Sequence, residues 1–338
     1  MTPRARSAVA AVFALAAVSA WAQKTELLVY TALETDQLKA YTESFQKTNP
    51  NIDLKFVRDS TGVITAKLLA EKSNPQADVI LGVAASSMEI FKAEGMLAPY
   101  APVGFDKLDP RYSDASRPPT WVGQDVFAAV VCYNTVEGQK KGIPKPETWA
   151  DLAKPVYKGQ ITMPNPASSG TGYFDVSGWL QTMGEQGGWK YMDALHENIA
   201  QYTHSGSKPC RQAGAGEFVV GISFDFRGND VKQKGAPVDL VFPKEGLGYD
   251  IEGSGIVKTT KKMDAAKKLM DWVATKEANE AYAKNFALVA HPDVKPVLPH
   301  LPPDLDKRLI KNDFAFAAKN RDRILAEWNR RYAAKTEK

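Results

Sequence analysis

Hydrophobic residues along the chain follow two alternating patterns. Short, mostly apolar runs are typical of buried strands, and between them large apolar residues recur every three or four positions, as on one face of a helix. The first helix of this kind carries Leu38, Tyr41 and Phe45. By this pattern, strands are expected at residues 26–30, 52–57, 78–81, 126–133, 160–163, 218–224 and 238–242.

Helices are expected between and after these strands. They are predicted at residues 61–72, 148–152 and 264–284, after Ser168-Ser169-Gly170, around Met88 and Phe91, and at the C-terminal end. Strands that alternate with helices indicate β-α-β units and a mostly parallel sheet. A segment rich in Pro, Asp and Ser, residues 99–119, interrupts the alternation, which then resumes. The pattern therefore predicts an α/β protein with two lobes.

The composition narrows the class of protein without identifying it. Of 338 residues, 44% are hydrophobic and 24% are charged, which allows a sizeable core and argues against a disordered, collagen-like or coiled-coil chain. The 43 basic residues nearly balance the 39 acidic ones. So weak a bias gives no case for nucleic acid or an anionic membrane as the main partner, since both require a concentrated basic surface.

The N-terminus has the three parts of a secretory signal peptide. Arg4 and Arg6 precede an apolar run at residues 8–20, and Ala20-Trp21-Ala22 provides small residues for cleavage. The run is shorter than the ~20 residues that cross a bilayer, so a membrane anchor fits less well. We expect residues 1–22 to be removed and the mature protein to act in the periplasm.

Two cysteines remain in the mature chain, Cys132 and Cys210. In an oxidising compartment an even pair is more often a disulfide than two free thiols, and the long loop between them would make such a bond stabilising. Two buried thiols are the alternative. Neither cysteine has a Cys or His neighbour at ligand spacing, so a metal site is not indicated.

Three loops at predicted strand ends place hydroxyl groups beside small residues and before a helix. In open α/β sheets, ligands bind beyond the carboxyl ends of the strands, where such loops lie. The loops contain Ser60-Thr61, Ala85-Ser86-Ser87 and Ser168-Ser169-Gly170-Thr171. Backbone N–H groups, helix dipoles and hydroxyl donors suit a tetrahedral oxyanion. Each loop alone is more simply explained as a helix N-cap, but three together favour an anion site.

Charged residues at other strand ends are further candidates. Glu34 and Asp225 would receive a cationic group, or else are surface acids. Arg227 would grip an anion with its planar guanidinium, or pair with Asp225 or Asp230. His204 would donate to an anion, although a lone histidine in a polar loop is usually just solvated. The remaining candidates lie in the same loops or in a segment that would form another wall of the ligand site. They are Thr31, Leu33, Ser205 and Tyr249.

Motifs of enzymes and cofactors are absent from the sequence. There is no Gly-x-Ser-x-Gly, no phosphate-binding P-loop, no dinucleotide Gly-x-Gly-x-x-Gly after the first strand and no His-Glu-x-x-His. With four histidines and two cysteines, a zinc centre is hard to assemble. We expect neither catalysis nor a cofactor.

Several motifs resemble those of periplasmic solute-binding proteins of ABC importers. They are Pro146-Glu-Thr-Trp-Ala-Asp-Leu152, Tyr157-Lys158-Gly159, and Gly216-Glu217 before a strand. The resemblance covers the mature chain and points to the two-lobed group related to ferric-ion and polyamine binders. It implies a class II binding-protein fold in which each lobe is a mostly parallel sheet flanked by helices, with a ligand cleft between them.

This resemblance also implies a division of the chain and a set of partners. One lobe would comprise residues 23–125 with about 245–290, and the other residues 126–244 with about 291–338. The protein would act as a monomer, capture a small molecule and deliver it to an importer permease.

Within that group, the residues fit an iron site poorly. Ferric-binding relatives carry two adjacent tyrosines after the Gly-Glu strand, where this chain reads Ser223-Phe-Asp-Phe-Arg-Gly228. They also place a histidine or similar ligand after the first strand, where this chain has Glu34. Their phosphate-holding Ser-Gly loop is matched by Ser169-Gly170-Thr171.

Three other stretches resemble the binding proteins of 2-aminoethylphosphonate importers: Val29–Glu34, Asn74–Val79 and Glu245–Glu252. The implied ligand is a zwitterion, with its phosphonate on the three hydroxyl loops, helped by Arg227 or His204. Its ammonium would lie against Glu34 and Asp225. A ferric ion, another small anion or a polyamine is the alternative ligand.

Overall fold

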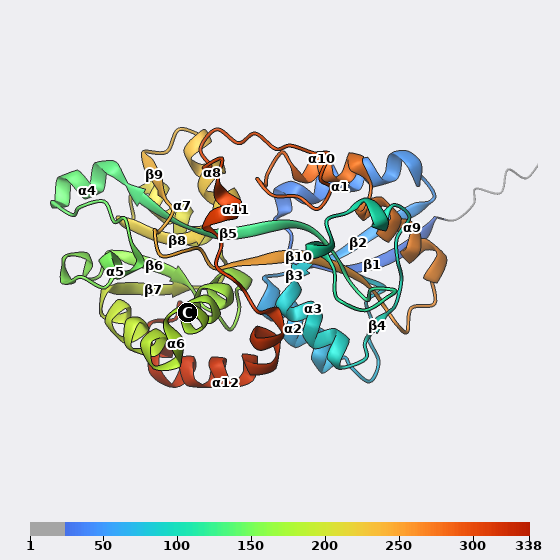
Figure 1. The fold of residues 1–338 in the computed structure, drawn as a ribbon, viewed down its shortest axis with the longest axis horizontal. Helices are drawn as coiled ribbons and strands as arrows, with labels where there is room; N and C mark the ends of the chain where they lie inside the picture. The colour runs from blue at the N-terminus through green and yellow to red at the C-terminus, as the bar shows by residue number, and fades with distance from the viewer. Residues whose placement is uncertain (1–23) are drawn as a thin grey trace, which may run out of the picture.

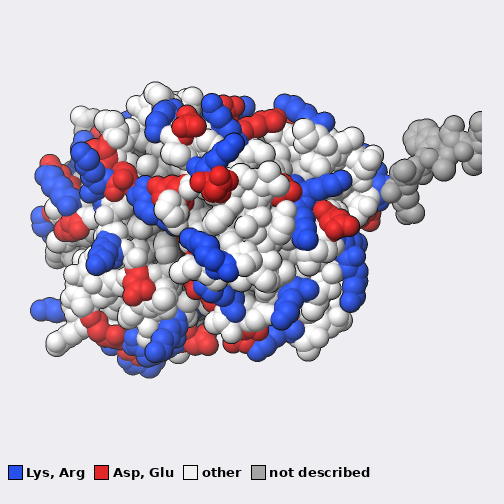
Figure 2. Space-filling model, turned by 45° about the vertical axis from the view of Figure 1, so that its right-hand side comes forward, with Lys and Arg blue, Asp and Glu red and all other residues white. Residues whose placement is uncertain are grey.

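The computed structural model describes residues 24–338, so the predicted signal peptide at residues 1–22 lies outside the described residues. Within this part of the chain, no helix has both the length and the apolar character needed to cross a membrane. Basic and acidic side chains are interspersed over the face shown in Figure 2.

The N-terminal half of the sheet consists of three parallel strands. Strand β1 (Thr25–Thr31) lies between β2 (Ile52–Arg58) and β3 (Val79–Ala84). Each strand is followed within a few residues by a helix: α1 (Thr35–Thr48), α2 (Thr61–Ala70) and α3 (Ala85–Ala93). The carboxyl ends of these strands and the N-termini of these helices therefore meet at one edge of the sheet.

Two long strands connect this half of the sheet to the other. Strand β5 (Val122–Asn134) pairs antiparallel with β10 (Tyr249–Val257) through its first half and with β8 (Val220–Phe224) through its second half. The other edge of β10 pairs with β3. Figure 1 shows β5 and β10 running side by side between the two halves of the molecule. The backbone thus crosses from one half to the other as a paired ribbon.

The second half of the sheet continues from β8. Strand β6 (Ile161–Pro164) pairs parallel with both β8 and β7 (Ile199–Thr203), which gives the order β2-β1-β3-β10-β5-β8-β6-β7. Two short strands flank the ribbon: β4 (Leu97–Ala98) beside β10 and β9 (Val238–Val241) beside β5.

The remaining helices cover the sheet and close the chain. Those of the middle region are α4 (Thr135–Lys141), α5 (Trp149–Leu152), α6 (Gly170–Asn198), α7 (Lys208–Ala215) and α8 (Asp225–Gln233). Those of the C-terminal region are α9 (Met263–Val273), α10 (Lys276–Tyr282), α11 (Leu305–Arg308) and α12 (Phe314–Tyr332). Single 3-10 turns lie at η1 (Phe105–Lys107), η2 (Pro110–Tyr112), η3 (Pro155–Tyr157) and η4 (Ala333–Lys335).

Two large hydrophobic clusters divide the interior. One is built from β1, β2 and β3 with α1, α9 and α10, and the other from β6, β7 and β8 with α6 and α12. This arrangement confirms the two-lobed α/β fold that the sequence predicts. Helix α12 packs against α3 of one lobe as well as α6 of the other, as Figure 1 shows along the lower side. The exact lobe boundaries remain our proposal.

Three local expectations differ from the structure. Residues 249–257 form the crossing strand β10, although their sequence mixes glycines with the acids Asp250 and Glu252 and does not read as a strand. Residues 199–203 form β7, which the pattern did not predict. The helix expected at 264–284 is two helices, because the Thr275 side chain accepts a hydrogen bond from Ala278 N and starts a new one. Antiparallel pairing of β5 and β10 also makes the sheet mixed.

The expected disulfide is present. Cys132 on β5 is bonded to Cys210 on α7, across 78 residues of sequence. Both cysteines are fully buried, next to Val130 and Ala213. The bond therefore fixes α7 to the crossing ribbon.

Candidate functional site

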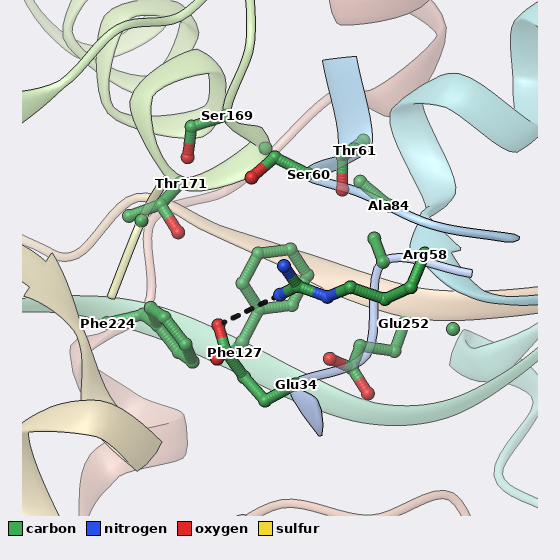
Figure 3. A pocket seen from close by; sticks show the side chains of 14 residues that line it. Glu34, Arg58, Ser60, Thr61, Ala84, Phe127, Ser169, Thr171, Phe224 and Glu252 are labelled. Carbon is green, nitrogen blue, oxygen red and sulfur yellow. Dashed lines mark ion pairs between the residues drawn. The ribbon is translucent and has the colours of Figure 1, made fainter. Parts of the chain in front are cut away.

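A cavity lies where the crossing ribbon meets the N-termini of α2 and α6. Its walls come from both lobes and carry hydroxyl, carboxyl and aromatic side chains. Figure 3 shows hydroxyl side chains on one side of it and carboxylates on the opposite side. The lining residues are Ala32, Glu34, Arg58, Ser60, Thr61, Gly82, Ala84, Phe127, Ser169, Gly170, Thr171, Gly206, Phe224 and Glu252.

The hydroxyl side is formed by two helix N-termini, one from each lobe. Ser60 and Thr61 begin α2, and the Ser60 side chain makes no capping hydrogen bond. Ser169 is the N-cap of α6, with Gly170 and Thr171 in its first turn. The two termini approach closely, since a Cβ on Gly170 would lie 2.8 Å from Thr61 Oγ1. Helix dipoles and hydroxyl donors here suit a tetrahedral anion.

Arg58 brings a cationic group into the middle of the cavity. It is the last residue of β2, and its Nε donates to the Leu33 carbonyl oxygen at 2.9 Å. Its Nη2 lies 3.5 Å from Glu34 Oε1, the ion pair drawn in Figure 3. Sequence reasoning did not select Arg58, although it directly precedes the Asp59-Ser60-Thr61 loop that was selected.

Glu34 lies at the cavity and contacts both lobes. It is the N-cap of α1, where its side chain and that of Gln37 form a capping box. From the other lobe, Ser207 Oγ donates a hydrogen bond to Glu34 Oε1. Arg227 Nη2 lies 3.1 Å from Glu34 Oε2, and Arg211 Nη2 lies 3.6 Å from the same oxygen. Arginines thus surround this carboxylate on both sides of the cavity.

Arg227 lies behind Glu34 and is not among the residues that line the cavity. Its side chain is only 1% exposed, and its Nη1 is 2.7 Å from Asp230 Oδ2 and 3.4 Å from Asp36 Oδ2. The guanidinium also stacks over the Phe226 ring. Of the two readings that the sequence left open, pairing with Asp230 is the contact observed.

His204 and Ser168 take part in contacts between the lobes. His204 Nε2 lies 2.9 Å from Asp59 Oδ1, and Ser168 accepts a hydrogen bond from Gly62 N at 2.8 Å through its carbonyl oxygen. The Ser168 hydroxyl donates to the His204 carbonyl oxygen. Partial burial raises the pKa of Asp59, but the hydrogen bonds from His204 and from the Ser60 amide outweigh burial and hold it below the ordinary value.

Four of the predicted site residues are buried beside the cavity instead of lining it. Thr31 Oγ1 accepts from Leu33 N, and Leu33 packs against Gly82. The Ser86 amide donates to Asp250 Oδ1 at 3.3 Å. These residues are fully or almost fully buried: Thr31, Leu33, Ala85 and Ser86.

The other predicted residues lie on neighbouring elements. Ser205 accepts a hydrogen bond from Thr203 through its carbonyl oxygen. Tyr249 packs its ring on Phe314. Asp225, at the start of α8, is fully buried and accepts from Ala128 N.

The crossing ribbon and β8 supply three lining residues, of which the sequence had indicated only Glu252, in the segment 249–252 considered as a further wall. Phe127 projects from β5, Phe224 from the end of β8 and Glu252 from β10. The two rings meet edge to face, with centroids 6.2 Å apart. Aromatic surface and a carboxyl group thus lie opposite the hydroxyl side.

Buried carboxyl groups gather beneath the cavity. Burial raises the pKa of Asp225 to about 7, although hydrogen bonds from the Ala128 and Phe226 amides oppose the shift. Burial likewise raises the pKa of Asp250 to about 6. These acids therefore titrate near neutral pH.

Comparisons with known proteins agree on the kind of protein. The model of the family described as bacterial extracellular solute-binding proteins matches residues 74–316. An uncharacterized protein of Haemophilus influenzae is 32% identical over 260 residues, which cover 76% of this chain and 75% of the relative. The structure of the periplasmic binding protein AfuA from Actinobacillus pleuropneumoniae with fructose-6-phosphate bound is 31% identical and superimposes with a TM-score of 0.83, covering 92% of this chain and 99% of that one.

The match to the 2-aminoethylphosphonate group is more distant than the sequence motifs suggested. A Salmonella typhimurium periplasmic protein named for binding 2-aminoethylphosphonate is 23% identical over 86% of each chain. The Fe(3+)-binding periplasmic protein of Serratia marcescens is equally distant, at 23% identity over 77% of each chain. The names of these two relatives point to different ligands.

We predict that Asp225→Asn flattens the pH dependence of unfolding. Because burial raises the pKa from 3.8 to about 7, the protonated Asp225 contributes stability that is fully present below pH 3.8 and is lost as the pH rises to about 7. Over this window the free energy of unfolding of the native protein should fall relative to the variant, by up to about 1.4 kcal/mol per pH unit. Urea unfolding at a series of pH values measures this difference.

The matched control is Asp264→Asn, which changes an exposed aspartate in the first turn of α9. Its pH profile should parallel that of the native protein. If the Asp225→Asn profile is parallel as well, the buried carboxyl does not carry the predicted proton.

Proposed function

The chain belongs to the family of bacterial extracellular solute-binding proteins, the binding components of ABC importers, and on this premise we propose that it captures a small organic phosphate between its lobes. Members of this family serve transport and are not enzymes, in agreement with the sequence. Its relatives include periplasmic proteins, which supports the proposal that this chain is exported to the periplasm and passes its ligand to a permease.

One observation carries the choice of ligand. The N-termini of two helices, one from each lobe, converge with four hydroxyl side chains on a single side of the cavity, and Arg58 reaches into its middle. A phosphate or phosphonate has three terminal oxygens that accept hydrogen bonds from several directions, which matches this set of donors. Because α2 and α6 come from different lobes, one anion held between them would draw the lobes together.

The opposite side of the cavity suits the hydroxyl-bearing body of a sugar phosphate. Glu252 and Glu34 offer acceptors, and Phe127 and Phe224 offer apolar surface. The similar structure with fructose-6-phosphate bound supports this class of ligand. The second candidate ligand is 2-aminoethylphosphonate, because the same carboxylates would attract its ammonium group. Glu34, however, already contacts Arg58 and Arg227.

An iron site has weaker support. None of the cavity-lining residues is a tyrosine or a histidine. Within residues 24–338 no cluster of three or more His, Cys, Asp or Glu side chains is placed to hold a metal ion. The two helix N-termini at the cavity also favour an anion as the ligand.

Ligand capture would proceed by lobe closure. Contacts that join the lobes in this structure include those of Gly62 with Ser168, Glu34 with Arg227, and Asp59 with His204. A ligand that touches both helix N-termini binds the closed form better than the open one and shifts the population toward it. The closed form would then dock on the permease.

We expect titration calorimetry to show binding of fructose 6-phosphate and none of spermidine or Fe(III). Weaker binding of inorganic phosphate should accompany it, because phosphate alone lacks the groups that reach the carboxylate side. Tight binding of 2-aminoethylphosphonate without binding of the sugar phosphate would favour the second candidate. A lack of heat with every phosphate and phosphonate would contradict the proposal.

Thr171→Val should weaken binding of the phosphate by tenfold or more, because it removes a hydroxyl while keeping the side-chain size, and a hydrogen bond to a charged group is worth roughly 1.5–3 kcal/mol. Thr182→Val, on the exposed part of the same helix, is the matched control. Calorimetry on both variants gives the comparison. Equal affinities would remove Thr171 from the site.

Gly62→Ala should oppose closure. A Cβ at this position would lie 2.1 Å from the Ala167 carbonyl oxygen, so the backbones of α2 and the loop before α6 would have to separate. Ligand affinity should drop by roughly tenfold or more, which corresponds to about 1.4 kcal/mol against the closed form. The variant should still unfold in one cooperative thermal transition without ligand, because neither hydrophobic cluster is changed. Gly187→Ala, where the nearest atom is Met183 Cβ at 3.3 Å, is the control, and equal loss in both variants would contradict the closure model.

A further inference from the structure

Two carboxyl groups lie side by side where the crossing strands pass beneath the cavity. In the ladder between β10 and β5, Ile251 pairs with Val126 and Gly253 pairs with Gly123. The bulge between these two pairs places Glu252 of β10 opposite residues 124–125 of β5, which include Asp125. The two carboxyl groups are within hydrogen-bonding reach of each other. Asp125 is fully buried, and Glu252 is 9% exposed and lines the cavity. The pair therefore connects the interior of the hinge to the ligand site.

No salt bridge connects the pair to a basic side chain among residues 24–338. Both oxygens of Asp125, and Oε2 of Glu252, receive no hydrogen bond from any N–H or hydroxyl group among residues 24–338. The charged groups that raise the pKa values of the pair are acidic, Glu34 at the start of α1 and Asp225 at the start of α8. Arg58 lines the same cavity as Glu252, but it is paired with Glu34. Two buried like charges without a cation are strongly disfavoured.

The other titratable groups around the pair are phenols. Tyr41 comes from α1, Tyr112 from η2 and Tyr282 from α10. Burial raises the pKa of each, so they are neutral under ordinary conditions and supply no charge. Burial and the neighbouring carboxylates likewise raise the pKa of Asp125 and of Glu252 well above their ordinary values. At least one proton must stay on the pair.

We propose that Asp125 is a positioning residue that keeps this proton and donates a hydrogen bond to one oxygen of Glu252, which thereby presents its other oxygen to the ligand. Asp125 is the more deeply buried member, so the uncharged form belongs there. Glu252 then accepts a hydrogen bond from the end of the ligand that lies away from the phosphate. This inference rests on the proposed function, because it assigns a partner to the non-anionic part of the same ligand.

Replacing the acid by its amide is therefore expected to affect ligand affinity differently at position 125 and at position 252. Asn at position 125 retains an N–H donor for Glu252, so the orientation of Glu252 survives. Ala at position 125 removes the donor and opens a space behind Glu252. Gln at position 252 replaces the acceptor that faces the ligand by a neutral amide.

Calorimetry with fructose 6-phosphate and infrared difference spectroscopy test the assignment together. Asp125→Asn should keep the affinity within about threefold, whereas Asp125→Ala and Glu252→Gln should each lower it by about tenfold or more. In the infrared, the native protein minus Asp125→Asn should show the carbonyl stretch of a protonated carboxylic acid at neutral pH. A structural role alone would not produce that band.

Asp175→Asn is the matched control, because Asp175 is also a fully buried carboxyl with a raised pKa but lies on α6 outside the cavity lining. It should remove a protonated-acid band and leave the affinity unchanged. The assignment is overturned if Asp125→Asn removes no such band, or if it weakens binding as much as Asp125→Ala. If Asp125→Ala does not fold, Asp125→Asn and Glu252→Gln still decide. If the native protein binds no fructose 6-phosphate, the ligand proposal fails, while the infrared band still tests the proton on Asp125.

Discussion

The buried guanidinium of Arg227 constrains how the two lobes meet. A cation that is 1% exposed requires anions around it, and its own helix supplies only Asp230. The remaining carboxylates, Glu34 and Asp36, come from the first turn of α1 in the other lobe. Closure thus completes the coordination of Arg227, and opening exposes it to water. The same contact holds Glu34 at the cavity, so the ligand site and the interface between the lobes share one carboxylate.

The crossing ribbon is the second element on which the site depends. Because β5 pairs with β10 at one end and with β8 at the other, a rotation of the lobes has to be absorbed within this ribbon or at its ends. Phe127 and Glu252 project from the ribbon into the cavity, where the lobe surfaces move toward them. Bulges on both edges of β10 interrupt the ladder close to Glu252. The floor of the site is therefore continuous with the hinge.

The sequence predicted the hydroxyl side of the site better than its other side. Ser60, Thr61, Ser169 and Thr171 follow strands and precede helices, so local signals of strand end and N-cap place them without knowledge of tertiary contacts. The segment that carries Glu252 was expected as a further wall, but not as a crossing strand, because it contains glycines and acids and is stabilised by pairing on both edges. The position of Arg227 depends on carboxylates nearly two hundred residues away, which no local pattern encodes.

The arrangement of charge explains how such a site distinguishes anions. Arg58 and Arg227 are matched by Glu34, Asp36 and Asp230, so they leave little net positive charge for a ligand. An incoming dianion is therefore stabilised mainly by hydroxyl groups and helix N-termini, whose geometry is fixed by the backbone. An anion with a single acceptor atom cannot accept hydrogen bonds from donors that converge from two lobes, whereas the oxygens of a tetrahedral phosphate ester can accept from both lobes. Selectivity in this cavity would thus follow from the direction of the donors more than from net charge, which agrees with the near-neutral balance of the whole chain.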